Sequence, residues 1–112
     1  MTVWKVSFRK MSSKLMGLLS ICRKAGKMVM GFEPSKEAIL CGTACSVITA
    51  SDISPKTEKE IRFFADKKNI PVVESDCTME DFYNGIGKKV GLIALCDEGF
   101  SKKAIEISTE NI

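Results

Sequence analysis

The first third of the chain carries side chains suited to binding negative charge. Residues 1–32 contain seven lysines and arginines and no aspartate or glutamate, whereas residues 33–112 contain ten basic and fourteen acidic side chains. The whole chain has a formal net charge of only +3. A patch of one sign attracts a polyanion through its summed field and through the release of condensed counterions. We therefore expect a nucleic acid to bind near the basic N-terminal segment.

Three of these cations, Arg23, Lys24 and Lys27, cluster at the end of a predicted helix. An apolar stripe at the spacing i, i+3, i+4 and i+7 predicts this helix, and Gly26 ends it. Cations at a helix C-terminus also complement the helix dipole, which is the simpler explanation of the cluster. That explanation does not account for the absence of acidic residues further back.

Gly31 stands between a predicted strand, Met28–Met30, and a helix predicted to start near Pro34. A glycine at such a junction lets a ligand approach the backbone, and a helix N-terminus offers free amides to phosphate. A glycine that only turns the chain would give the same pattern, so both interpretations stay open. No glycine-rich fingerprint for a nucleotide is present here.

A second glycine-rich segment, residues 85–91, precedes the last predicted strand. It combines three glycines with Lys88 and Lys89, which suit phosphate contacts, and with Ile86 and Val90, which suit contact with a base. A tight loop before a buried strand would look similar. We keep this segment as the second candidate binding element.

The sequence shows no constellation of residues typical of a catalytic site. The chain has no histidine, which removes most zinc sites and imidazole acid–base schemes. Asp52 has no visible partner base, so we interpret it as a loop cap. Five cysteines form no regular framework, and Gly42 keeps Cys41 and Cys45 off a shared helix. We expect no catalytic residues, no metal and no cofactor, and we interpret the cysteines as small buried hydrophobes.

Length and composition indicate one domain spanning residues 1–112, with residues 1–11 as a basic arm or an edge strand. The N-terminal segment lacks the continuous apolar core of a secretory signal, and no apolar run approaches the roughly 20 residues of a membrane span. We expect a cytoplasmic protein with no membrane contact.

Apolar strands alternate with amphipathic helices along the chain. Strands are predicted at 28–30, 46–50, 70–74 and 90–95, and helices near 13–25, 34–41, 57–68, 78–85 and 100–107. This alternation favours a largely parallel sheet with both faces covered. The predicted fold class is α/β, a three-layer α-β-α sandwich.

Several short motifs, in this order and spacing, resemble one family. They are Leu18–Lys27, Gly31–Ile39, Val47–Asp52, Asn69–Val72, Ile86–Lys88 and Asp97–Phe100. Together they are similar to the large-subunit ribosomal proteins seven-Ae and thirty-e, and most of all to small bacterial stand-alone members. The resemblance implies a four-stranded mixed sheet and binding to structured ribosomal or other noncoding RNA, with kink-turns as the usual target and with the ribosome as one setting.

In that family, the strand–helix junction, the helix after it and the loop before the last strand hold the RNA. Together with the basic cluster, these segments give the candidate RNA-binding residues Arg23, Lys24, Lys27, Gly31, Phe32, Glu33, Lys36, Glu37, Ile86, Lys88, Lys89 and Val90.

The chain departs from the family's kink-turn motif after its glycine. Glu33 stands at the asparagine position, Pro34 at the glutamate position and Glu37 at the lysine position, with Lys36 one residue early. Carboxylates near an RNA backbone are unfavourable, and proline removes an amide donor. We therefore expect RNA binding through phosphate contacts more than through base edges. The alternatives are a protein-interaction module, or an RNA-recognition partner of an RNA-modifying enzyme.

Overall fold

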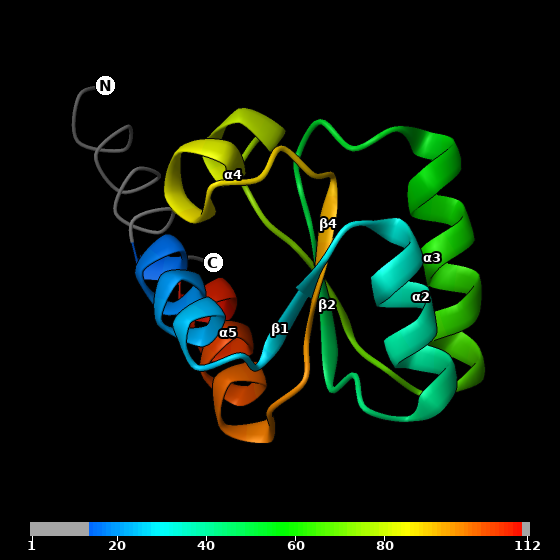
Figure 1. Ribbon diagram of the computed structural model, residues 1–112. Helices are drawn as coiled ribbons and strands as arrows, with labels where there is room; N and C mark the ends of the chain where they lie inside the picture. Colours follow the sequence, from blue (N-terminus) through cyan, green and yellow to red (C-terminus); the bar gives the residue numbers. More distant parts are fainter. Residues whose placement is uncertain (1–13, 111–112) are drawn as a thin grey trace.

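The computed structural model describes residues 14–110, with side chains through residue 108, as a central sheet covered by helices on both faces (Figure 1). A helix over residues 14–24, here called the N-terminal helix, comes first. The elements that follow are β1 (Met28–Met30), α2 (Phe32–Cys41), β2 (Ser46–Thr49), α3 (Pro55–Lys67), β3 (Val72–Glu74), α4 (Met79–Ile86), β4 (Leu92–Leu95) and α5 (Glu98–Glu110). The predicted alternation of helices and strands is confirmed. The arm or edge strand predicted at 1–11 lies outside the described residues.

The sheet is mixed, in the order β1-β4-β2-β3. Strand β4 pairs antiparallel with both β1 and β2, and only β2 and β3 pair in parallel. The expectation of a largely parallel sheet is therefore wrong, although β1, β2 and β3 all run in one direction. The reversed strand sits inside the sheet, so it turns two of the three pairings antiparallel.

The short helix α4 explains this reversal. In the register, Thr49 stands opposite both Glu74, where β3 ends, and Leu92, where β4 begins. The connection between β3 and β4 thus starts and finishes at the same end of the sheet, and α4 packs near that end (Figure 1). A helix that does not carry the chain back to the other end cannot lead into a parallel strand. The alternating sequence pattern does not reveal this.

The two central strands divide their side chains between two cores. Strands β2 and β4 are buried at every position. Ile48 and Ile93 face the core under the N-terminal helix, α4 and α5, whereas Val47 and Ala94 face the core under α2 and α3. Successive strand residues point to opposite faces, so a strand covered on both sides is apolar throughout.

Three helices start two residues earlier than predicted; in α3 and α5 the added residues are not part of the apolar stripe, and in α2 they are Phe32 and Glu33. Helix α3 begins at Pro55, a residue suited to the first helical position, with Ser54 as its cap. Helix α5 begins at Glu98, where Asp97 Oδ2 accepts a hydrogen bond from the Phe100 amide at 3.0 Å. Helix α2 begins at Phe32.

The cysteines differ in exposure and form no disulfide among the described residues. Cys22 and Cys77 are fully buried, and Cys41 is exposed. Burial, with smaller effects from the charges of Asp97 and Cys96, raises the pKa of the Cys22 thiol to about 11. Helix α2 ends at Cys41, with Gly42 in a left-handed conformation, so no helix carries both Cys41 and Cys45. The expected burial is therefore confirmed for Cys22 and Cys77 and is wrong for Cys41, because Cys41 lies at the exposed end of α2.

Over residues 14–110, no three histidine, cysteine, aspartate or glutamate side chains gather in a way that would hold a metal ion. Within the same range, no helix has both the length and the apolar character needed to cross a membrane.

Thiol labelling tests this arrangement of cysteines. With iodoacetamide near pH 8, we expect Cys41 to react first and Cys22 and Cys77 to react only on unfolding, because the thiolate is the reactive form and burial disfavours it. Peptide mass spectrometry gives the order, and full labelling in urea is the control. Labelling of Cys22 before Cys41 in the native protein would contradict the core described above.

Two glycine substitutions should have opposite effects on stability. Gly31 has φ 98° and ψ 168°, a region that only glycine adopts readily, so Gly31→Ala should lower the free energy of unfolding by about 1–3 kcal/mol. Gly17 lies inside the N-terminal helix with nothing within 4 Å of an added Cβ, so Gly17→Ala should raise it by up to ~1 kcal/mol. Urea titrations of both variants measure the difference, and equal shifts would refute the assigned backbone conformations.

Candidate nucleic-acid interface

Gly31 fixes the start of α2 directly to the central strand β4. Its amide donates a hydrogen bond to the Leu92 carbonyl at 2.9 Å, and its own carbonyl accepts from the Ser35 amide at 3.2 Å. Gly31 occupies the N-cap position without any side-chain cap. The first turn of α2 therefore has no capping side chain, and phosphate binding at this junction stays a prediction.

The two segments that the sequence singled out separately meet in space. A Cβ built on Gly31 would lie 3.8 Å from Cγ1 of Val90. Val90 is half-buried and packs against the core under α4 and α5. The junction at Gly31 and the loop before β4 thus form one continuous surface at the start of β4.

Arg23 joins this surface from the N-terminal helix. A Cβ on Gly87 would lie 3.2 Å from the Arg23 Nη1 atom, so the guanidinium stands at the loop that α4 leads into. Ser20 Oγ donates to the Gly85 carbonyl at 3.4 Å, and Met16 packs on the same glycine. These contacts hold the N-terminal helix against the C-terminal end of α4, whose partial negative charge Arg23 also complements.

Lys27, another cation of the basic cluster, does not lie near Gly31. Lys24 and Lys27 are exposed, but Lys27 precedes β1 and its carbonyl accepts from the Cys96 amide at 2.8 Å, beyond the end of β4. Gly31 lies at the opposite end of β1, about 13 Å away at the rise of an extended strand. The exposed Lys88 and Lys89, in contrast, lie in the loop itself. Of the cluster at 23–27, Arg23 is the residue whose side chain reaches the loop before β4.

The expected contact between Ile86 and an RNA base is excluded by burial. Ile86 is 2% exposed and belongs to the core, as does Phe82, which is fully buried. The reason is that α4 continues through Ile86, and helix periodicity places residues 82 and 86 on the same inner face. Val90 remains the apolar candidate of this loop. Phe32 is half-buried and packs against the core under α2 and α3.

The acidic and basic side chains of α2 point in different directions. Glu33 and Glu37 are exposed and one helical turn apart, so they share a face beside the junction. Lys36 instead extends toward α3, where its Nζ atom lies 4.9 Å from the ring centroid of Phe64. The expected role of Lys36 at the junction therefore loses support, and the outer surface of α2 near Gly31 is acidic.

Asp52 acts as a cap, as the sequence indicated. Its Oδ1 atom accepts a hydrogen bond from the Met79 amide at 2.9 Å, which ties the turn after β2 to the start of α4. Helix α4 also has its own capping box, formed by Thr78 and Asp81. No local pattern predicts the link between Asp52 and Met79, because a helix and a strand separate the two residues along the chain.

Comparison with known proteins agrees with this geometry. Residues 13–105 match the model of the ribosomal protein L7Ae/L30e/S12e/Gadd45 family. The chain is 30% identical to the RNA-binding protein YlxQ of Enterococcus faecium over 94 residues, which cover 84% of this chain and 90% of that protein. It is 28% identical to the large ribosomal subunit protein eL30 of Aeropyrum pernix over 81 residues, which cover 70% and 81% of the two chains.

Two solved structures share the fold. A Bacillus halodurans protein of unknown function superposes with a TM-score of 0.81 at 27% identity, covering 86% of this chain and 97% of that one. The Giardia lamblia 15.5kD RNA binding protein superposes with a TM-score of 0.68 at 16% identity, covering 90% and 87%, and at that identity the likeness concerns the fold. With its motifs, its mixed sheet and the match over residues 13–105, this chain belongs to the ribosomal protein L7Ae/L30e/S12e/Gadd45 family.

Proposed function

We propose that this protein is a non-catalytic RNA-binding protein that recognises structured RNA at the start of β4. The observation that carries the proposal is the convergence of Arg23, the Gly31 junction and the loop before β4 on one surface. An acid-free N-terminal third and a relative named as an RNA-binding protein support it further. Ribosomal or other structured noncoding RNA is the substrate class that the family membership favours.

Each part of this surface has a separate role in the proposal. Arg23, Lys88 and Lys89 contact phosphates, and their charges supply a sequence-independent share of the affinity. Gly31 lets the RNA backbone approach the first turn of α2. Val90, half-buried beside Gly31, offers an apolar contact to an unstacked base.

The acidic face of α2 sets the specificity. Glu33 and Glu37 stand side by side next to the junction, where they repel phosphates and cannot make the contacts of an asparagine and a lysine. Pro34 offers no amide. We propose that the protein binds structured RNA broadly, with weaker selectivity for kink-turns than the family's motif would give.

Removal of charge at the interface should change both affinity and salt dependence. The double variant Arg23→Ala/Lys88→Ala should bind structured RNA more weakly across sequences, with a slope of log K against log salt smaller by about 1–2, because fewer counterions are released. Lys102→Ala/Lys103→Ala removes two exposed charges from α5 and is the matched control. An unchanged slope for the first variant, or equal losses in both, would refute the interface.

A comparison of two RNAs tests specificity. We expect the protein to bind a kink-turn RNA and the same helix without its internal loop with affinities that differ by less than about tenfold, because base-edge contacts are reduced. Glu33→Asn/Glu37→Lys should increase the preference for the kinked form. Fluorescence anisotropy at two salt concentrations measures both. Wild-type binding to the kinked form alone would contradict broad recognition, and binding to neither RNA would contradict the function.

A further inference from the structure

The outer face of α3 carries an exposed aromatic ring among lysines. Ile61 and Ala65 are fully buried and define the inner face of the helix. Helical rotation places Phe63 on the opposite side, where it is 56% exposed. Lys59 and Lys67, one turn before and one turn after Phe63, are exposed on the same side. Single exposed apolar residues are common on protein surfaces, so the contacts of this ring decide whether it is a site.

Two lysines from different helices bracket a pair of phenylalanine rings. Lys67 Nζ lies 4.5 Å from the Phe63 ring centroid, and Lys36 Nζ of α2 lies 4.9 Å from that of Phe64. The rings of Phe63 and Phe64 meet edge to face, with centroids 5.5 Å apart and planes at 74°. Phe64 is half-buried against the core under α2 and α3. Phe63 is therefore held by an anchored neighbour and is not a freely moving side chain. We call Lys36, Phe63, Phe64 and Lys67, together with the exposed Lys59, the phenylalanine–lysine patch.

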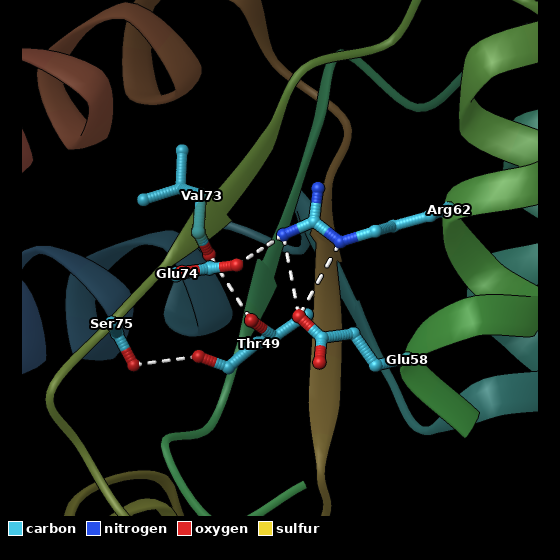
Figure 2. A network of polar contacts seen from close by, with 6 residues as sticks. All are labelled: Thr49, Glu58, Arg62, Val73, Glu74 and Ser75. Carbon is cyan, nitrogen blue, oxygen red and sulfur yellow. Dashed lines mark hydrogen bonds and ion pairs between the residues drawn. The ribbon is translucent and has the colours of Figure 1, made fainter. Parts of the chain in front are cut away.

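The remaining cation near the middle of α3 does not belong to this patch. Figure 2 shows Arg62 turned toward β3, where it contacts Glu58 and Glu74. In the part of the chain that the structure describes, the ion pairs made by α3 are those of Arg62 with Glu58 and with Glu74. Within the same part, Lys36, Lys59 and Lys67 form no ion pair. Glu60 and Asp66 are exposed at the two edges of the outer face and balance the charges of Lys59 and Lys67, so the aromatic ring rather than a net charge distinguishes this face.

We propose that the phenylalanine–lysine patch is a second RNA contact, which takes an unpaired strand. One base stacks on Phe63, and the phosphates on either side of it contact Lys59 and Lys67. Stacking tolerates any base because every base has a π face. Lys67 Nζ lies over one face of the Phe63 ring, so the base takes the other face and the lysines complement the backbone on either side of it. This inference rests on the proposed function, since it assigns a second segment of the same class of ligand.

The surroundings of Phe63 favour a nucleic-acid strand over a partner helix. A docked amphipathic helix needs a row of apolar anchors at i, i+3, i+4 and i+7. Around Phe63 the corresponding positions hold Lys59, Glu60, Asp66 and Lys67, all of them exposed and charged. One exposed aromatic ring with charged neighbours suits the stacking of one base.

The two RNA surfaces can be occupied together. Helix α3 covers one face of the sheet, and the N-terminal helix, which carries Arg23, covers the other (Figure 1). The first surface also includes the first turn of α2, which lies beside α3, and we place the unpaired strand on the outer face of α3, away from Arg23 and the loop before β4. The protein would link a folded RNA element to an adjacent single-stranded segment.

Binding of an unstructured, labelled RNA of about ten nucleotides, a length within the usual site size, tests the patch by anisotropy. Phe63→Leu keeps an apolar side chain but removes the π face, so it should weaken binding roughly fivefold or more, whereas Phe63→Trp should preserve it. Tyr83→Leu is the matched control, because Tyr83 is also 56% exposed but lies on α4. Equal binding by wild type and Phe63→Leu, or an equal loss in Tyr83→Leu, would overturn the proposal.

A second arm separates this inference from the proposed function. With the Arg23-dependent site saturated by an unlabelled structured RNA, the labelled strand should still bind, and Phe63→Leu should leave binding of the structured RNA unchanged. If the structured RNA displaces the strand, there is one site, so the inference fails and the proposed function stands. If the structured RNA does not bind but the strand binds through Phe63, the proposed function fails and the α3 contact stands.

Discussion

The position of β4 inside the sheet is the constraint on which the rest of this structure depends. This strand is buried at every residue, pairs with β1 on one side and with β2 on the other, and contributes side chains to both cores. Its first carbonyl, that of Leu92, also accepts the Gly31 amide. The loop before β4 must therefore lie beside the start of α2, and the candidate interface exists because of this pairing.

The helical layers on the two faces of the sheet position different cations. The layer formed by the N-terminal helix, α4 and α5 brings Arg23 to the loop through the packing of Met16 and Ser20 on Gly85. The layer formed by α2 and α3 turns Lys36 away from the junction and toward Phe64. Arg23 and Lys36 both belong to the predicted RNA-binding residues, but the fold places them on different surfaces.

The net charge of the chain does not reveal that its charged side chains lie on different surfaces. A formal charge of +3 describes a weakly basic protein, whereas the fold separates an acidic face at Glu33 and Glu37 from basic loops at Lys88 and Lys89. At physiological salt, charges influence one another over roughly 8 Å, so the local arrangement decides which anion binds where. The stacking surface at Phe63 depends less on charge than the loops do.

The sequence by itself determined the order of elements, the apolar central strands and the residues of the junction and the loop, because hydrophobic periodicity and glycine placement act over a few neighbouring residues. It also indicated the family through motifs spread along the chain. Only the tertiary structure decided that β4 runs backwards between β1 and β2, that Ile86 is core, that Lys36 faces α3 and that Gly31 meets Val90. These outcomes depend on which elements pack together, and pairing between residues distant in sequence leaves no local pattern to read.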